Sequence, residues 1–523
     1  MTRPAALRLG VPARGMLTHR TLAQLLAPDR LVPGRHRDVD VLLAWGRRPS
    51  ALRVERLAQR WDLPVWHLED GLLRSMAKGR DHPPLALLVD DLGVHFDATV
   101  PSRIEQLIAA PITAAEADRA RALQRLWCEQ RLSKVNPPLE AEVPQEPYVL
   151  VVDQSAGDRS IALGLADASC FQRMLQAALD EHPDCTVVLK VHPDVISGRA
   201  RGHFSAKDLA QPRVRISADG GHPARLLERA RAVYVVTSQM GFEALLWGRP
   251  VHCFGMPFYG GWGLTHDRCE APIRRRQGVS LEALVHAALV GGCRCIDPQR
   301  HQACSIEVLM GAIGLQRRLQ AQQPRRCVAF GFTPWKQRNL RRFLAGSQLL
   351  FRAPWRRIPH GVDAVVVWGR RAKPRLLEAA ARRQLPVLQV EDGFLRSVGL
   401  GADLVDPVSW VVDHQGVYYD ATRPSDLETL LATQQWTSAQ CQRAAALRQR
   451  LVQEAITKYN LQAEPWSRPA GQRRVVLVIG QVESDASIRY GAPGLRTNRA
   501  LLEAVRAAEP QAYLVYKPHP DVV

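Results

Sequence analysis

The stretch Asp38-Val-Asp-Val-Leu-Leu-Ala-Trp-Gly46 is followed by a helical pattern at residues 50–60 and by Leu63-Pro-Val-Trp-His-Leu68. Both named stretches are rich in aliphatic and β-branched residues, which is typical of buried parallel strands. The second one runs into Glu69-Asp70-Gly71, so it brings two carboxylates to a strand end. The same strand–helix–strand pattern returns at residues 362–369, 374–383 and 385–390. This alternation predicts an α/β fold with mostly parallel sheets.

Three polar motifs each occur twice in the chain. They are Glu69–Ser75 with Glu391–Ser397, Gln154–Asp158 with Gln481–Asp485, and Lys190–Asp194 with Lys517–Asp521. Asp158 and Asp485 are 327 positions apart, whereas solenoid repeats recur every ~20–50 residues. The chain is therefore a duplicated module of domain size. Recent duplication alone would leave the same trace, but the diverged flanks and the polar character of the motifs favour function.

A proline-bearing linker at 136–147 separates two α/β runs in the first repeat. Its second run is predicted to contain strands at 148–153, 186–191, 232–237 and 250–254, the last of them final, with helices at 169–181 and 241–247. Ligands bind beyond the carboxyl ends of strands in open α/β sheets, and every recurring motif falls at such an end. The predicted domains are 1–145, 146–320, 325–470 and 471–523.

The second repeat begins near Arg325 and is shorter than the first. Its second domain holds one strand–helix–strand unit, at 475–479, 497–508 and 513–517. By the same offset, counterparts of Ser238 and Glu243 would lie near positions 565 and 570, past Val523. We therefore expect the second module to be incomplete and inactive in this sequence, with an open sheet edge.

The composition indicates a soluble, strongly basic protein. Its 523 residues carry 70 Lys+Arg against 51 Asp+Glu, a net charge of +19. This surplus indicates anionic partners such as phosphates, anionic sugars, nucleic acid or an acidic membrane surface, or else an inert basic surface. Because no apolar run is long enough to span a membrane and residues 1–30 lack a signal-peptide pattern, we expect a cytoplasmic location. The ten cysteines are expected to be free thiols, and the spacing around Cys293-Arg-Cys295 disfavours zinc.

Two motifs are candidates for binding a phosphate and a sugar. Lys190, His192 and Pro193 close a predicted strand and open a loop or helix, where free backbone N–H groups and cations can hold an anion. Ser238, Gly241 and Glu243 lie between a predicted strand and helix. Ser238 can meet a phosphate and Glu243 ribose hydroxyls, or the two can form a capping box.

The recurring carboxylates are candidates for catalysis. Asp158, with Gln154 four residues before it, follows a predicted strand and can be a nucleophile, a general base or a helix cap. Glu69 and Asp70 are adjacent, with Arg74 available to hold one of them ionised. Adjacent side chains diverge, so we expect one of the two in the site and one in a structural role. Two carboxylates from facing domains suit sugar transfer.

Taken together, the motifs resemble those of the KpsC family of retaining β-Kdo glycosyltransferases of capsule biosynthesis. The resemblance covers the duplicated module, E-D-G-x-L-R-S, Q-x-x-x-D, K-x-H-P-D and the segment Ser238–Leu245. It implies tandem GT-B-like modules, each of two Rossmann-like domains, that transfer Kdo from CMP-Kdo to a lipid-linked, Kdo-containing acceptor. It also implies a covalent aspartyl-Kdo intermediate on Asp158, binding of the CMP phosphate by His192, and no metal or other cofactor.

The resemblance carries over to the second module only formally. The matching residues there are Glu391, Asp392, Gln481, Asp485, Lys517 and His519. The sequence lacks the rest of the family's second donor domain and its C-terminal membrane-associating region. Further partners implied by the family are capsule assembly proteins and the inner face of the cytoplasmic membrane, where the chain would be peripheral.

Two other functions compete with sugar transfer. The first is a basic nucleic-acid-binding protein, which the low aromatic content of 6% and the absence of a binding motif disfavour. The second is a non-catalytic glycan-binding scaffold, which would have no need of Asp158 and Glu69.

Overall fold

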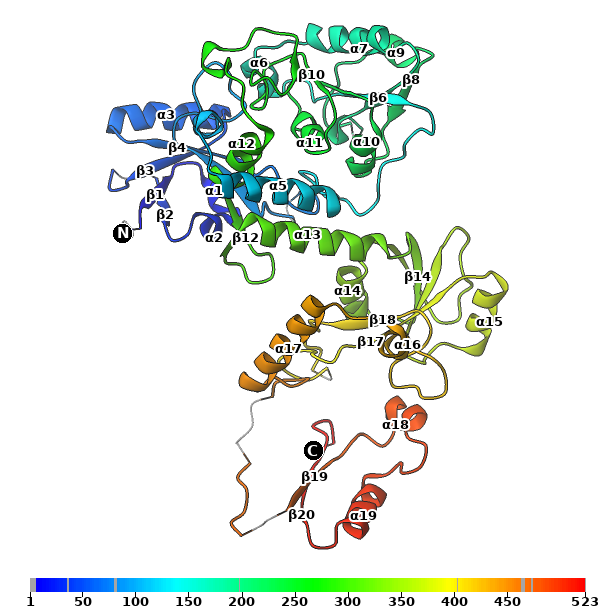
Figure 1. Cartoon of the computed structure of the whole chain (residues 1–523). Coiled ribbons are helices and arrows are strands. Elements are labelled where there is room, and N and C mark those ends of the chain that lie inside the picture. The colour runs from blue at the N-terminus through cyan, green and yellow to red at the C-terminus, as the bar shows by residue number, and fades with distance from the viewer. Residues whose placement is uncertain are drawn as a thin grey trace. The chain divides into compact units, whose positions relative to one another are not determined.

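A computed structural model describes residues 6–34, 37–79, 82–196, 198–401, 403–461, 466–471 and 474–522. The chain forms two compact units, Met1–Ala321 and Gln322–Val523. Figure 1 labels the helices and strands of both units along the ribbon. The boundary between the units falls beside Arg325, where the second repeat was predicted to begin.

Two sheets form the first unit. The first has the order β13-β12-β5-β4-β3-β1-β2 and the second the order β11-β10-β9-β6-β7-β8. The strands of the first sheet are β1 Arg8–Val11, β2 Arg30–Pro33, β3 Val41–Trp45, β4 Val65–Asp70, β5 Ala86–Asp90, β12 Cys293–Ile296 and β13 Ala303–Cys304. Those of the second are β6 Tyr148–Val152, β7 Thr186–Lys190, β8 Val214–Ser217, β9 Val233–Val235, β10 Val251–Cys253 and β11 His266–Asp267. All pairs in the second sheet are parallel, so it is Rossmann-like.

The chain returns to the first sheet after completing the second. β12 pairs antiparallel with β5, and β13 pairs antiparallel with β12. The range 146–320 expected for the second domain therefore contains two strands of the first sheet. The segment 250–254 is also not the final strand, because β11 adds to its edge. These strands were not predicted from the sequence, because β11 to β13 are only two to four residues long and lack hydrophobic alternation.

Helices connect and cover these strands. They are α1 Arg14–Leu17, α2 Leu22–Leu26, α3 Pro49–Trp61, α4 Arg103–Ala109, α5 Ala114–Glu129, α6 Arg159–Leu163, α7 Ser169–Glu181, α8 Pro193–Ile196, α9 Ala206–Leu209, α10 Ala224–Arg229, α11 Met240–Leu246, α12 Leu281–His286 and α13 Ile306–Ala321. A 3₁₀ turn at Ile273–Arg275 and a π-helical turn at Ala287–Gly291 complete the unit. The predicted helices at 50–60, 169–181 and 241–247 are all present, with shifts of at most one residue at either end.

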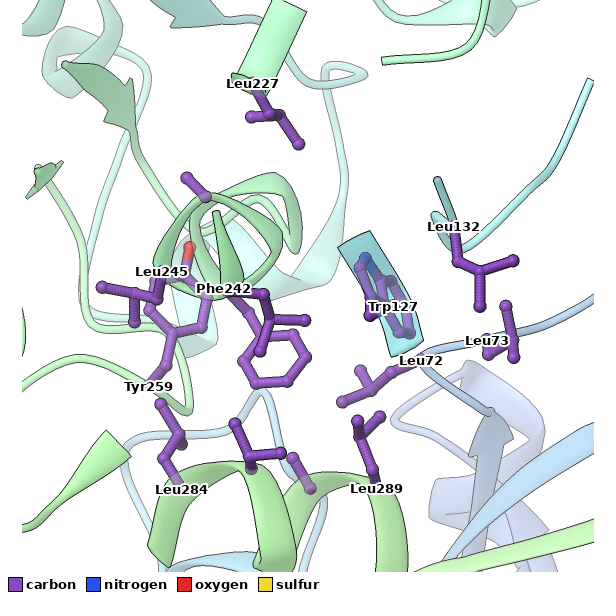
Figure 2. Packing of buried hydrophobic residues seen from close by; sticks show 14 of the residues in the cluster. Leu72, Leu73, Trp127, Leu132, Leu227, Phe242, Leu245, Tyr259, Leu284 and Leu289 are labelled. Carbon is purple, nitrogen blue, oxygen red and sulfur yellow. The ribbon is translucent and has the colours of Figure 1, made fainter. Parts of the chain in front are cut away.

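One hydrophobic core joins the two sheets of the first unit. It contains residues on both sides, among them Leu72 after β4, Trp127 on α5 and Phe242 on α11. Figure 2 shows Leu72 between Trp127 and Leu289, with Phe242 facing the helical segment that carries Leu284 and Leu289. Each fully buried apolar side chain of this kind stabilises the folded state by about 1.5–3 kcal/mol. The shared core therefore joins the two sheets into one folded unit.

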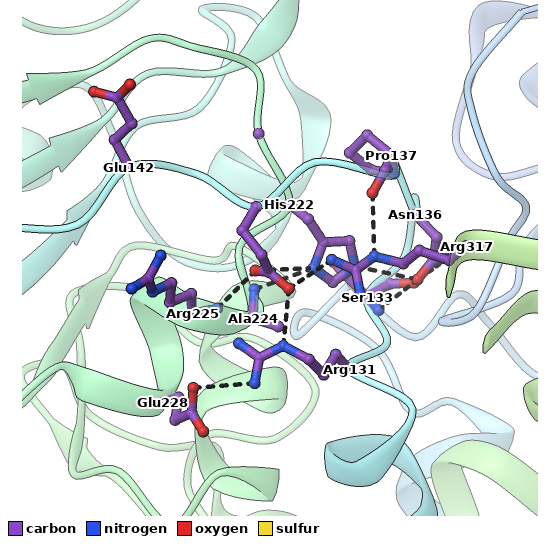
Figure 3. A network of polar contacts seen from close by, with 12 residues as sticks. Arg131, Ser133, Asn136, Pro137, Glu142, His222, Ala224, Arg225, Glu228 and Arg317 are labelled. Atoms are coloured by element: carbon purple, nitrogen blue, oxygen red, sulfur yellow. Dashed lines mark hydrogen bonds and ion pairs between the residues drawn. The ribbon is translucent and has the colours of Figure 1, made fainter. Parts of the chain in front are cut away.

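A buried polar network holds the linker that passes between the sheets. The Glu140 carboxylate accepts from Arg131 Nε at 2.8 Å and from Arg317 Nη2 at 2.5 Å. His222 is fully buried, and its Nε2 lies 3.3 Å from the side-chain oxygen of Asn136. Figure 3 shows the side chains of Arg131 and Arg317 meeting in the middle of this network. Burial lowers the pKa of His222 well below its ordinary value, so the ring is neutral.

The second unit repeats the first sheet of the first unit. Its strands are β14 Arg326–Phe330, β15 Gln348–Arg352, β16 Ala364–Trp368, β17 Val387–Asp392 and β18 Trp410–Asp413, in the order β15-β14-β16-β17-β18. Its helices are α14 Pro334–Phe343, α15 Pro374–Arg382, α16 Asp426–Thr433, α17 Ser438–Gln453, α18 Ala486–Gly491 and α19 Asn498–Ala508. A separate parallel pair, β19 Val475–Ile479 and β20 Tyr513–Lys517, leaves Leu477 and Ile479 more than half exposed. Such open apolar strands were expected from the sequence.

Candidate active site

A cavity of about 390 Å³ lies between the strand ends of the two sheets in the first unit. Five of the residues predicted from the sequence line it: Glu69, Gln154, Asp158, His192 and Ser238. The other predicted residues of this unit do not line it: Asp70, Arg74, Lys190, Pro193, Gly241 and Glu243. The side chain of Pro193, which begins α8, lies outside the described part of the chain. The structure therefore brings together the catalytic candidates of both sheets.

Glu69 lies at the end of β4, against the backbone of Gly46 at the end of β3. Gly46 has a φ of +49°, and a Cβ added there would lie 2.1 Å from Oε1 of Glu69. Only glycine satisfies both conditions without displacing the carboxylate. Burial raises the pKa of Glu69 to about 7, although nearby Lys134 opposes the shift. A carboxyl group with this pKa can accept or release a proton near neutral pH.

Asp70, the neighbour of Glu69, is turned away and paired with Arg74. Arg74 Nε donates to Asp70 Oδ2 at 2.9 Å, and Nη1 donates to Ser75 Oγ and to the His82 carbonyl oxygen. The guanidinium is almost fully buried, and these bonds fix the loop that follows β4. Only one of the two adjacent carboxylates faces the cavity, as their adjacency predicts. Asp70 and Arg74 are placed to support this loop.

Asp158 immediately precedes α6 and lines the cavity. Its Oδ1 accepts from the backbone N–H of Ser160 at 2.9 Å, which makes it the N-cap residue. Asp158 also borders a second, wider depression of about 720 Å³. Asp158 is therefore a helix cap, as one of the predicted alternatives had it, through its Oδ1 atom. The residue also borders both the cavity and the wider depression.

Gln154 ties the two central strand ends of the second sheet together. Its Oε1 accepts from the backbone N–H of Thr237 at 2.9 Å, and its Nε2 donates to Thr237 Oγ1 at 3.0 Å. Ser160 Oγ lies 3.1 Å from the same Thr237 hydroxyl. Because Ser160 is in the first turn of α6, this network fixes the helix that Asp158 caps.

His192 is held as a neutral ring with a defined tautomer. Its Nδ1 accepts from the backbone N–H of Asp194 at 3.1 Å, so the proton of the neutral ring is on Nε2. Burial lowers its pKa, and Lys78 adds to that effect. Lys190 instead has its ammonium 3.5 Å from the Gly221 carbonyl oxygen, with a pKa lowered by burial. His192, which lines the cavity, therefore carries an N–H donor on Nε2, whereas Lys190 does not line the cavity.

The segment after β9 only partly fits its predicted roles. Ser238 lines the cavity and accepts from the backbone N–H of Met240 at 3.3 Å. The capping-box interpretation is wrong, because Gln239 is the N-cap and its side chain makes no capping bond. Gly241 is required by packing, since a Cβ there would lie 2.2 Å from the Tyr259 hydroxyl.

Glu243 is enclosed in the core between the sheets. It is 1% exposed, and its Oε1 accepts from the Lys134 backbone N–H and from Gln239 Nε2, both at 3.1 Å. Burial raises its pKa to about 7. It does not reach the cavity, so a ribose contact would require the chain over it to move. A sequence motif cannot reveal such burial, because one of the two partners of Glu243, Lys134, belongs to the other predicted domain.

Most of the cationic residues that line the cavity were not predicted from the sequence. Arg47, Arg48, Lys78, Lys134 and Arg159 line the cavity together with His95. The duplication could have revealed several of them, since Gly46-Arg-Arg48 returns as Gly369-Arg-Arg371 and Lys134 returns as Lys458. The backbone oxygen of Lys134 accepts from the backbone N–H of Arg74 at 2.9 Å, and that of Lys458 accepts from the backbone N–H of Arg396 at 2.9 Å.

The cavity is an anion-binding environment that also contains two carboxylates. Arg47 is paired with Glu55 and Asp97. Cations and N–H donors of this kind bind phosphate or carboxylate groups. Among the described residues, no group of three or more His, Cys, Asp or Glu is placed to hold a metal ion. This holds for Cys293 and Cys295 as well, whose sulfur atoms lie 3.5 Å apart as free thiols.

Two Rossmann-like lobes with the site between their strand ends define the first unit as a GT-B-like α/β fold. The chain belongs to the family of capsule polysaccharide biosynthesis proteins, whose model matches residues 40–133, 117–293, 363–465 and 439–523. The paired matches in each half follow the duplication. In the part of the chain that the structure describes, every helix is too short or too polar to cross a membrane.

Known proteins similar to this chain include two from bacterial surface-polysaccharide systems. The capsule polysaccharide modification protein LipA of Neisseria meningitidis serogroup B is 37% identical over 98% of this chain and 75% of its own length. The lipopolysaccharide-processing protein LpsZ of Rhizobium meliloti is 37% identical over 45% of this chain and 56% of its own length.

A solved structure is similar to the chain as well. It is the β-Kdo 2,4 transferase of Thermosulfurimonas dismutans KpsC, which is 35% identical with a TM-score of 0.55. The match covers 59% of this chain and 98% of that structure. The resemblance to the KpsC family drawn from the sequence is thereby confirmed.

Proposed function

We propose that this chain is a retaining glycosyltransferase that moves Kdo from CMP-Kdo to a lipid-linked, Kdo-containing acceptor of capsule biosynthesis. One observation carries the proposal: Asp158 from the second sheet and Glu69 from the first line the same cavity. Family membership and the similarity to a Kdo transferase support the choice of donor. A nucleic-acid-binding protein or a glycan-binding scaffold would not need this pair.

In the first step, the Asp158 carboxylate attacks the anomeric carbon of Kdo. The bond between that carbon and the CMP phosphate oxygen breaks, and CMP leaves with the electron pair. The charge that develops on the phosphate is stabilised by the Nε2–H of His192 and by cations such as Arg159 and Lys78. Asp158 is suited to this attack because only Oδ1 is used in capping α6.

In the second step, an acceptor hydroxyl attacks the same carbon and the bond to Asp158 breaks. Asp158 recovers the electron pair, and Glu69 accepts the hydroxyl proton. The pKa of Glu69, raised to about 7 by burial, suits this exchange. Two successive displacements at one carbon retain its configuration.

Mass spectrometry of the covalent intermediate tests the proposal. Incubation of the protein with CMP-Kdo and no acceptor should add the mass of one Kdo to the peptide that contains Asp158. Asp158→Ala should give neither adduct nor transfer. Asp167→Ala is the matched control, because Asp167 accepts from the Ser169 backbone N–H at 2.8 Å next to α7, yet does not line the cavity. Full activity in Asp158→Ala would refute the mechanism.

A further inference from the structure

A compact basic surface with an exposed tryptophan lies on the second unit, on the loop after β15 and along α15. Its members are Arg352, Trp355, Arg356, Arg357, Lys373, Arg375 and Arg382, and we refer to them as the Trp355 patch. They border two shallow depressions of about 680 and 540 Å³. Trp355 is 75% exposed, although a tryptophan of a soluble domain is normally largely covered.

Hydrogen bonds from the end of α15 anchor the loop that follows β15. Arg383, in the turn that ends α15, donates to the carbonyl oxygens of Ile358 and Pro359 at 3.0 and 3.1 Å. Ile358 is buried, and the Arg356 backbone N–H closes a turn on Ala353 at 3.0 Å. Trp355 therefore projects from an anchored loop beside an edge strand.

The positive charge of the patch is not neutralised by ion pairs among the described residues. None of its six cations forms an ion pair with an acidic side chain among the described residues, and all six are exposed. Elsewhere in the same unit, arginines such as Arg338 and Arg370 are paired with aspartates. Like charges held close together repel one another unless an anionic partner is bound.

The duplicated architecture does not require the patch. In the first unit the segment between β2 and β3 is shorter, from Gly34 to Asp40, and has no tryptophan. There Arg8 is paired with Asp38 at 2.6 Å. The patch is thus an addition of the second unit, and it does not contain the E-D-G motif that the two units share.

We propose that the Trp355 patch binds the anionic phospholipid headgroups of a membrane surface. Arginine forks bind phosphate oxygens with two parallel bonds, and clusters of basic residues are attracted to acidic leaflets. Tryptophan favours the membrane–water interface, where its ring contacts acyl chains and its N–H meets the headgroups. A single tryptophan among six cations on an exposed face matches a flat bilayer, whereas proteins that track a nucleic-acid strand use grooves with several aromatic residues.

Vesicle sedimentation of the full chain tests the proposal without any need for sugar transfer. The protein should sediment with vesicles of equal parts phosphatidylglycerol and phosphatidylcholine, and not with phosphatidylcholine alone. Arg356→Gln/Arg357→Gln should weaken the binding about 30-fold, from the contribution of two basic residues near an acidic surface. Trp355→Ala should weaken it several-fold.

Matched variants on α17 and before it serve as controls. Arg443→Gln/Arg448→Gln removes two exposed arginines, and Trp436→Ala removes a tryptophan that is 54% exposed; both should leave vesicle binding unchanged. Failure to bind acidic vesicles, or equal losses in patch and control variants with unchanged circular dichroism, would overturn the proposal. It would also be overturned if the patch variants lost binding to heparin, a soluble polyanion, while keeping their binding to vesicles.

Discussion

The carboxylate of Glu69 lies against the backbone of Gly46, and Glu391 lies against Gly369 in the same way. A Cβ on Gly46 would approach Glu69 Oε1 to 2.1 Å, and one on Gly369 would approach Glu391 Oε2 to 2.8 Å. Both glycines have a positive φ, +49° and +45°. The duplication has thus kept a contact between two neighbouring strand ends, and not merely a set of residue types. The glycine fixes where the carboxylate can lie.

Gly46→Ala should reduce sugar transfer by about tenfold or more. The new methyl group would displace Glu69, and the left-handed backbone costs about 1–2 kcal/mol for a residue with a Cβ. Gly248→Ala is the matched control, because Gly248 has a φ of +66° but open space around it. The melting temperature of Gly248→Ala should fall about as much as that of Gly46→Ala, while its transfer activity stays unchanged. Comparable activity losses in the two variants would show that strain alone is responsible.

The rate of transfer should rise with pH through about 7 if Glu69 accepts the acceptor's proton. The raised pKa also affects stability: the folded state binds this proton more tightly than the unfolded state. The contribution of Glu69 to unfolding free energy is therefore largest below its ordinary pKa and declines as pH rises through about 7. Glu69→Gln should remove both dependences, as measured by initial rates and by denaturant titration.

Glu243→Gln is the control for the pH dependence. Glu243 has the same raised pKa of about 7 but lies in the core and does not line the cavity. Its substitution should change the pH dependence of stability and leave the rising limb of the rate profile in place. A rate profile that loses this limb in Glu243→Gln and keeps it in Glu69→Gln would contradict the assignment.

His192→Ala should weaken CMP binding by about tenfold, from the loss of an N–H donor to phosphate worth ~1.5 kcal/mol. The control is His519→Ala in the second repeat, where the Asp521 backbone N–H is also bound by the ring Nδ1 at 3.1 Å. Calorimetry should find an unchanged dissociation constant in that variant. An unchanged constant in His192→Ala would remove the residue from the donor site.

We predict that CMP binds in the cavity of the first unit and that Asp485 of the second repeat takes no part in transfer. Asp485 occupies the N-cap position of α18, as Asp158 does for α6, but its side chain makes no capping bond to the helix. Asp485→Ala should leave transfer unchanged, whereas Asp158→Ala should abolish it. Titration that finds two CMP sites of similar affinity would contradict this prediction.

Donor binding should not depend on a metal ion. We expect cations such as Arg48, Lys134 and Arg159 to balance the charge of the nucleotide and the sugar acid. Transfer rates measured before and after treatment with EDTA should agree. A collapse of activity that added Mg²⁺ or Mn²⁺ reverses would argue for a metal-dependent site.

The sequence revealed the parts of the fold that rest on local patterns. The strands β3, β4, β6 and β7 are apolar and follow one another at regular spacing, so periodicity sufficed to predict them. The duplication identified Glu69, Asp158 and His192 because their neighbours recur with them. Both signals come from residues that are close in the chain.

What the sequence concealed depends on contacts between distant segments. Whether Glu243 faces the cavity or the core is decided by Lys134, more than a hundred positions away. Ionic pairing of Asp70 with Arg74, by contrast, could be anticipated from their spacing of four residues. The cations that line the cavity likewise come from several separate loops, so no single sequence motif predicts them.

The return of β12 and β13 to the first sheet has a consequence for enzyme engineering. The second lobe cannot be exchanged between relatives as one contiguous cassette, because cutting near residues 146 and 320 would remove two strands from the lobe that stays behind. A chimaera with a new donor specificity would need its second junction before Cys293. The first sheet would then keep its own strands β12 and β13.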